Sequence, residues 1–151
     1  MVNRFERFTF AMSKISKCWH KLTTDEMAKY GLKGPHSVYL IAMYRHEDGI
    51  TAPQLCDICG KDKADVSRMM SIMEKKGLVT KEGSNQNRYG GVWKLTPEGK
   101  AAAEYVRERA RLAVELGGKG LTEEDRAAFY RAMELIVSNL QKMSEEGLPP
   151  Q

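Results

Sequence analysis

The 151-residue chain has no long hydrophobic run and few cysteines. Its densest apolar patch covers residues 38–43, whereas a helix that crosses a bilayer needs about 20 residues, so we expect no membrane partner. Three cysteines cannot all be paired in disulfides. The first ten residues mix charges with apolar side chains and have no small-residue cleavage site, unlike a secretory signal. We therefore expect the protein to work in the reducing cytoplasm.

Catalytic and metal-binding motifs are also missing from the sequence. It has no G-x-S-x-G, and the Gly-Gly pair at residues 90–91 precedes a strand-like run, so that pair is not a phosphate-binding loop. Cys56 and Cys59 form a C-x-x-C pair, but a zinc site needs two more ligands and no second pair of suitable spacing exists. The sequence therefore predicts a protein that is not an enzyme and holds neither a metal nor a cofactor.

The composition and the distribution of charge are more informative. The chain is 42% hydrophobic and 29% charged, which is typical of a globular protein, and its length fits one domain over residues 1–151. The net charge of +4 is uneven, because residues 1–50 and 51–95 each carry +3 whereas residues 96–151 carry −2. The basic first two-thirds favours contact with a polyanion.

Two apolar stripes at helical spacing lie near the two ends of the chain. They predict one helix over residues 3–21 and another over residues 122–143, the second capped by Thr122. The stripes consist of Phe5, Phe8, Met12, Ile15, Trp19 and Leu22 in the first helix, and of Phe129, Met133, Ile136, Val137, Leu140 and Met143 in the second. Each stripe must pack either on the protein's own core or on a partner chain.

Three further helices are expected outside the central region. Thr24 is expected to cap a short helix that ends at Gly31, and Pro35 to open a helix that ends near residue 46. Thr96 and Pro97 are expected to begin a longer helix that ends near residue 116. The side chains predicted to face inward are Val38, Ile41 and Tyr44 in the second of these helices, and Ala101, Tyr105, Leu112 and Leu116 in the third.

The central region has the pattern of a helix-turn-helix followed by a β-hairpin. Thr51 is expected to cap a helix that ends at Gly60, and Asp62 to cap a second helix that ends at Gly77. The predicted buried face of the second helix consists of Val66, Met69, Met70 and Met73. Strand-like runs at residues 78–81 and 92–95 flank a polar, glycine-rich tip over residues 82–91. This order of elements predicts a winged helix-turn-helix.

The outward face of the second helix suits a DNA groove. A major groove is about 12 Å wide and accepts a helix that presents small or polar side chains. A basic residue at the hairpin tip reaches neighbouring phosphates or the minor groove. The predicted DNA-binding residues are Lys63, Ala64, Ser67, Arg68, Ser71 and Lys75 of the helix and Arg88 of the wing.

Residues 54–79 (QLCDICGKDKADVSRMMSIMEKKGLV) and the following NRYGGVWKLTPEGK resemble the MarR family of bacterial winged helix-turn-helix transcription regulators. The resemblance implies a mostly α protein with a small β-hairpin wing, which acts as a homodimer on the double-stranded DNA of a pseudo-palindromic operator. The function implied is that of a repressor relieved by a small aromatic or phenolic effector. The DNA-binding head would cover residues 34–96, and the dimerisation helices residues 1–22 and 97–145.

The resemblance also assigns roles outside the helix-turn-helix. The dimer interface would consist of Phe5, Phe8, Met12 and Ile15 with Phe129, Met133, Ile136 and Leu140, and the effector pocket of Trp19, Tyr30, Tyr39 and Tyr44. The wing departs from the family's pattern of an acid, one residue and an arginine, because residues 87–89 read Asn-Arg-Tyr. The usual ion pair within the wing is therefore not expected.

Two other readings of the same residues stay open. Cys56 and Cys59, or Cys18 alone, would serve a regulator that responds to metals or to thiol oxidation, although a small apolar role under the second helix suits the C-x-x-C pair. A winged helix that binds another protein and no DNA is the second alternative. Salt-dependent binding of duplex DNA separates this alternative from the DNA-binding one.

Overall fold

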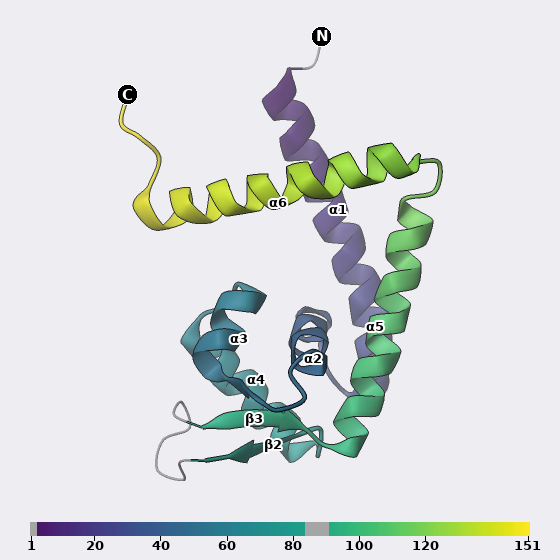
Figure 1. Ribbon diagram of the computed structural model, residues 1–151, viewed down its shortest axis with the longest axis vertical. Coiled ribbons are helices and arrows are strands. Elements are labelled where there is room, and N and C mark those ends of the chain that lie inside the picture. The colour runs from purple at the N-terminus through teal and green to yellow at the C-terminus, as the bar shows by residue number, and fades with distance from the viewer. Residues whose placement is uncertain (1–2, 84–90) are drawn as a thin grey trace. The chain divides into compact units, whose positions relative to one another are not determined.

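The computed structural model describes residues 3–83 and 91–151, which form two compact units, Met1–Arg111 and Leu112–Gln151 (Figure 1). The elements in chain order are α1 (Arg4–Met27), η1 (Ala28–Tyr30), η2 (Gly34–His36), α2 (Ser37–Tyr44), β1 (Ile50–Thr51), α3 (Ala52–Cys59), α4 (Lys63–Lys75), β2 (Val79–Glu82), β3 (Val92–Leu95), α5 (Pro97–Gly117) and α6 (Glu123–Glu146). The predicted class, mostly helical with a small antiparallel sheet, is confirmed.

Helix α1 is longer than the sequence indicated. Asn3 caps it, since its side-chain oxygen accepts a hydrogen bond from the Glu6 N–H at 3.0 Å, and the helix then continues to Met27. The predicted break at Thr24 was therefore wrong. Gly34 of η2 packs directly against this turn, where a Cβ on Gly34 would lie 2.8 Å from the Thr24 backbone nitrogen. This packing of η2 on α1 depends on residues ten positions away, which local capping propensity does not include.

Helix α2 is buried on a different face from the one predicted. Tyr39, Leu40, Ala42 and Met43 are buried, whereas Val38, Ile41 and Tyr44 are only half-buried. The helix is apolar at nearly every position, so the sequence gives little information about its rotation. Contacts with α3 and with the sheet decide which side faces the core.

The central helices follow the predicted boundaries closely. Thr51 and Gln54 form a capping box at the start of α3, and Gly60 ends that helix in the left-handed conformation with φ 63°. The Asp62 side chain caps α4 by accepting a hydrogen bond from the Asp65 N–H at 2.7 Å. The turn between the two helices is thereby fixed at both ends by local chemistry that is readable from the sequence.

A small sheet lies beside these helices in the order β1-β3-β2, and both pairs are antiparallel. Strands β2 and β3 are the predicted hairpin, with Val79 opposite Leu95 and Glu82 opposite Val92. Strand β1 was not predicted. It has two residues, too few for an alternating pattern, and it exists because Ile50 pairs with Trp93 of β3.

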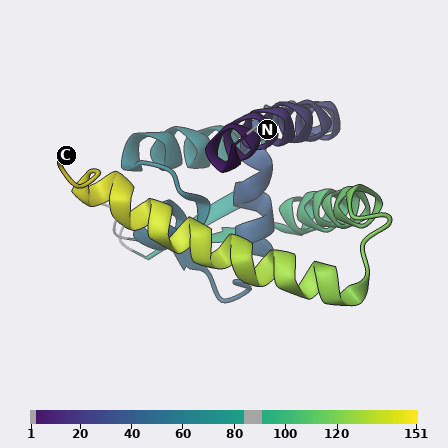
Figure 2. The same ribbon diagram turned by 90° about the horizontal axis from the view of Figure 1, so that it is seen from above.

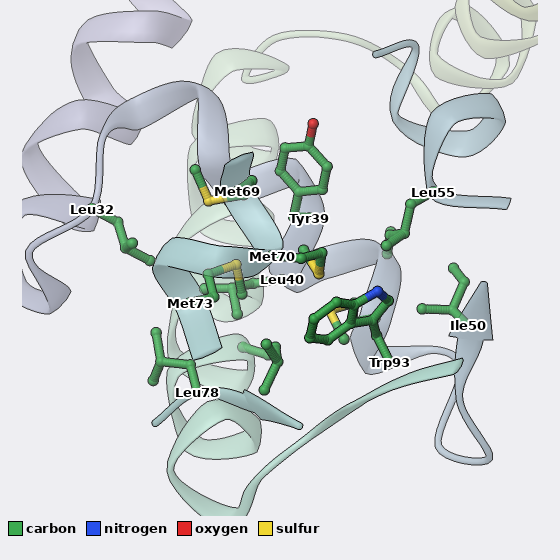
Figure 3. Close-up of a cluster of buried hydrophobic side chains, with 14 of the residues drawn as sticks. Leu32, Tyr39, Leu40, Ile50, Leu55, Met69, Met70, Met73, Leu78 and Trp93 are labelled. Atoms are coloured by element: carbon green, nitrogen blue, oxygen red, sulfur yellow. The ribbon is translucent and has the colours of Figure 1, made fainter. Parts of the chain in front are cut away.

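One hydrophobic core joins the sheet and the helices of the first unit (Figure 3). The buried side of α4 consists of Val66, Met69, Met70 and Met73, as predicted. Figure 3 shows Met69, Met70 and Met73 in one cluster with Leu40 of α2 and Trp93 of β3. Unbranched thioether side chains fill the irregular space between two helices and a sheet well.

Helix α5 packs on the hydrophobic core through very small residues. Its buried positions are Gly99, Ala102, Ala103 and Val106, so the predicted inward residues Ala101, Leu112 and Leu116 were wrong and Tyr105 is half-buried. The Thr96 hydroxyl accepts a hydrogen bond from the Gly99 N–H at 3.0 Å and donates one to the Gly77 carbonyl at 2.6 Å. This anchor sets the rotation of α5 and brings its backbone against Leu78.

Helix α6 belongs to the second unit and is one uninterrupted helix (Figure 2). The Thr122 hydroxyl accepts a hydrogen bond from the Asp125 N–H at 3.0 Å, as the capping pattern predicted. None of its residues, Glu123–Glu146, is buried. No helix within residues 3–83 and 91–151 combines the length and the apolar character that crossing a membrane requires.

Candidate nucleic-acid interface

Helix α4 presents two chemically different sides. One side holds the core residues Val66 and Met69, which are 1% exposed, together with Met70 and Met73. On the other side, Lys63, Ala64, Ser67, Arg68 and Lys75 are exposed and Ser71 is half-buried. A helix that is locked to the core on one side and polar on the other has the form required to enter a groove.

The predicted DNA-binding residues of α4 therefore all lie on a surface of this one helix. Arg88 of the wing, the remaining predicted residue, lies outside the described residues. Ile72 was not among the predicted residues, but it is 40% exposed on α4. An apolar group at such a position is suited to contact a thymine methyl group.

Arg68 forms a local chain of contacts that sequence reasoning did not find. One guanidinium nitrogen, Nη2, lies 3.8 Å from Asp65 Oδ2, and the Tyr39 hydroxyl donates a hydrogen bond to Asp65 Oδ1. Tyr39 belongs to α2 and is completely buried, whereas the Arg68 side chain is 70% exposed. The i, i+3 spacing of Asp65 and Arg68 was visible in the sequence, but the contact with Tyr39 depends on how α2 packs against α4.

The base of the wing carries basic groups that flank the sheet. Lys94 of β3 forms an ion pair with Glu82 of β2 at 2.9 Å, and the Lys81 ammonium lies 5.7 Å from the centre of the Trp93 ring. These contacts join the two strands on both faces of the hairpin. They bring Lys81 and Lys94, which the sequence analysis did not single out, to the base of the wing.

A cluster of polar groups joins the end of α1 to α5. Glu26 accepts hydrogen bonds from the Tyr105 hydroxyl at 2.8 Å and from Arg109 Nε at 2.9 Å, and Lys29 Nζ lies 3.1 Å from the same carboxylate. The hydrogen bond from Tyr105, followed by those from Arg109 and Lys29, lowers the Glu26 pKa from 4.5 to about 2. Glu26 therefore remains charged at neutral pH and holds α1 to α5.

The aromatic side chains predicted to form an effector pocket have different surroundings. Tyr39 is completely buried and exposes no surface. Tyr30 packs edge-on against Tyr105, with ring centroids 6.2 Å apart, and Tyr44 lies under the Arg107 guanidinium at 5.2 Å. Trp19 is 38% exposed on α1. The half-buried tyrosines both face α5.

The three cysteines also differ in their surroundings. Cys18 is exposed on α1, whereas Cys56 and Cys59 of α3 are half-buried and pack on the core. Burial raises the pKa of the Cys59 thiol from 9.0 to about 11, and its Sγ lies 3.8 Å from the Val38 carbonyl oxygen. No three His, Cys, Asp or Glu side chains gather as metal ligands within residues 3–83 and 91–151.

Large apolar side chains remain exposed on both terminal helices. In α1 these include Phe5 at 69%, Ile15 at 59% and Met12 at 48% exposure, and in α6 Phe129 at 50% and Leu140 at 44%. Soluble proteins rarely leave contiguous apolar stripes of this kind uncovered.

The helix-turn-helix region of this chain matches the model of a known protein family. The MarR family model matches residues 30–88, which include α2, α3, α4 and β2. A comparison with curated proteins finds no match.

Solved structures share the fold over nearly the whole chain. A MarR family transcriptional regulator from Listeria monocytogenes, complexed with a 26mer DNA, has 19% identity and a TM-score of 0.82 over 100% of this chain and 99% of its own. A regulator from Methanosarcina mazei Go1 has 19% identity and a TM-score of 0.80 over 94% of both chains. A MarR family regulator from Silicibacter pomeroyi has 22% identity and a TM-score of 0.72 over 87% of this chain and 88% of its own. The match over residues 30–88 and the shared fold together confirm the resemblance to the MarR family that the motif around α4 indicated.

Proposed function

We propose that this protein is a homodimeric MarR-type transcription regulator that binds a pseudo-palindromic operator in double-stranded DNA and represses transcription. The observation that carries the proposal is α4, whose methionine side is buried while Lys63, Ser67 and Arg68 are exposed. The similar Listeria regulator that is complexed with DNA supports the same use of the fold. In this proposal the head covers residues 34–96.

The chemistry of α4 divides the contacts into two kinds. Lys63 near the start of the helix and Lys75 at its end are suited to neighbouring phosphates, since ammonium groups bind them as point charges. Arg68 lies between them, and its planar guanidinium matches the O6 and N7 acceptors of guanine. Small side chains at Ala64 and Ser67 let the helix backbone approach the bases closely.

The exposed stripes of α1 and α6 support a homodimer through residues 1–22 and 97–145. A second copy offers the same stripes, so one twofold arrangement covers both. The interface residues we propose are Phe5, Phe8, Met12 and Ile15 with Phe129, Met133, Ile136 and Leu140. The two heads of such a dimer would read two half-sites.

A small aromatic or phenolic effector would relieve repression by favouring a dimer whose heads no longer match the half-sites. This requires that the effector bind that form more tightly than the DNA-bound form. The effector residues we propose are Trp19, Tyr30 and Tyr44, which keep partly exposed rings, together with Tyr39 of the core. The Glu26 cluster between α1 and α5 is the contact such an effector would disturb.

Duplex binding at two salt concentrations tests the DNA proposal. A labelled random duplex should lose affinity steeply between about 50 and 200 mM salt, because each phosphate contact releases counterions. The R68A variant should lose roughly 1–3 kcal/mol on a selected operator and show weaker base preference. Weak binding that does not depend on salt would instead favour a winged helix that binds protein.

The oligomeric state tests the dimer proposal separately. An I136D variant places a charge on the 40%-exposed stripe position of α6 and should shift the protein to monomers in analytical ultracentrifugation. Operator affinity should fall with it, since one head reads only one half-site. A variant at the exposed Glu145, E145Q, is the control on the same helix and should remain dimeric. A stable I136D dimer would place the interface elsewhere.

A further inference from the structure

Asp65 of α4 contacts both the buried Tyr39 and the exposed Arg68. Its Oδ1 accepts a hydrogen bond from the buried Tyr39 hydroxyl, and its Oδ2 lies 3.8 Å from Arg68 Nη2. We propose that Asp65 is a positioning residue that, braced by Tyr39, holds Arg68 toward a base edge and so determines specificity at the base pair Arg68 reads. This inference rests on the proposed DNA-binding function.

The brace behind Asp65 is rigid. Tyr39 is completely buried and packs in the core beside Met69 and Leu40, so its ring has little freedom to move (Figure 3). Burial, followed by its hydrogen bond to Asp65, raises the Tyr39 pKa well above its usual value of 10, so the hydroxyl remains a proton donor at every physiological pH. The Asp65 carboxylate is thus fixed from the side of the core.

The position of Asp65 in the helix leaves its side chain available for this role. The Asp65 backbone N–H already donates to the Asp62 side chain at 2.7 Å, so α4 is capped without using the Asp65 carboxylate. An acidic group in the first turn is also favoured by the helix dipole. The carboxylate, 35% exposed, can therefore serve Tyr39 and Arg68 together.

The effect on Arg68 follows from charge and from conformational entropy. A free arginine side chain on a helix surface samples many rotamers, and ordering them on binding costs affinity. Asp65 restricts this freedom beforehand. Its negative charge also disfavours a phosphate beside Arg68, so the remaining guanidinium donors are directed to neutral base acceptors such as those of guanine. Asp65 thereby converts Arg68 from a general anion binder into a base reader.

Two variants separate the charge of Asp65 from its bracing. D65N keeps the size of the side chain and removes the charge, whereas Y39F keeps the charge and removes the hydrogen bond from the core. The control is D57N, which removes one exposed carboxylate from α3 of the same head. Each protein is used to select bound sequences from random duplexes of about 30 base pairs, roughly three helical turns. The probes are the wild-type consensus and its single-base substitutions.

The expected results differ from those of a structural defect. R68A should reduce discrimination at one base pair of each half-site by about fivefold to a hundredfold. D65N and Y39F should reduce discrimination at the same base pair by at least about threefold, with the other positions unchanged. In D65N, Arg68 becomes available to phosphate, so random-duplex binding should tighten and the slope of log K against log salt should steepen by up to about 0.9. D57N should leave base preference unchanged.

Thermal melting of each variant shows whether a loss is structural. If D65N or Y39F lowered affinity equally on all sequences in proportion to its loss of thermal stability, the positioning role would be wrong. Unchanged preference at the Arg68 base pair in both variants would also overturn it, as would an R68A variant that keeps full discrimination. These outcomes presuppose a wild-type protein that binds duplexes with steep salt dependence. A wild-type protein without such binding would refute the proposed function itself.

Discussion

The close contact between α5 and the Leu78 backbone makes Gly99 a sensitive test of the fold. A Cβ at this position would overlap the Leu78 carbonyl oxygen, its nearest neighbour, and would lie 2.8 Å from the Leu78 carbonyl carbon and 3.2 Å from the Leu78 Cα. Ordinary carbon contacts are about 3.5–4.0 Å, and all three neighbours are backbone atoms that cannot swing aside, so α5 must move by more than about 1 Å in a G99A variant. The Leu78 carbonyl also accepts a hydrogen bond from the Thr96 N–H at 3.0 Å, and this bond would be strained.

The magnitude follows from three effects. Overpacking of this kind costs about 1–3 kcal/mol, and loss of one hydrogen bond costs about 1 kcal/mol. Replacing a helical glycine by alanine contributes up to about 1 kcal/mol in the opposite direction. The net effect on G99A is a destabilisation of about 2 kcal/mol, which lowers the Tm of a chain of this length by roughly 4–8 °C.

Circular dichroism melting at one fixed protein concentration measures this difference, since association makes the Tm depend on concentration. The matched control is Gly117→Ala at the end of the same helix, where no atom lies within 4 Å of the added Cβ. G117A should raise the Tm by about 1–3 °C through helix propensity alone. A G99A variant as stable as the wild type, or a G117A variant that loses stability to the same extent, would refute the packing argument.

Two further predictions concern titratable groups. Glu26 has a folded pKa of about 2 against 4.5 for the isolated group, so its stabilising contribution is complete above about pH 4.5 and is lost as the pH falls toward 2. E26Q should therefore be less stable than wild type by about 1 kcal/mol at pH 7, allowing for solvent screening. The difference between the urea midpoints of the two proteins should close near pH 2. A difference that does not depend on pH would contradict this. Cys59, with a pKa of about 11 rather than 9.0, should be thiolate in only about one molecule in ten thousand at pH 7, about a hundredfold less than an ordinary thiol. Mass spectrometry after iodoacetamide treatment should show Cys59 modified far more slowly than exposed Cys18, and equal rates in the native protein would favour the thiol-responsive alternative.

Local chemistry was sufficient to predict the central elements. Thr51, Gly60, Asp62 and Gly77 define the bounds of α3 and α4 because capping and left-handed glycine positions depend on neighbours within one turn. Val66, Met69, Met70 and Met73 recur at helical spacing among polar residues, so the buried side of α4 was predictable as well. The motif built on these residues was enough to indicate the family.

Tertiary packing decided the rest. Helix α1 continues through Thr24 because Gly34 packs against it, α5 turns Gly99, Ala102 and Ala103 inward because Thr96 anchors it, and β1 forms only because β3 offers it a partner. Likewise, the spacing along α4 places Asp65 and Arg68 one helical turn apart, but only the packing of α2 against α4 brings the Tyr39 hydroxyl to that carboxylate. Contacts between residues distant in the chain leave no periodic signal in the sequence, whereas caps and helical faces do.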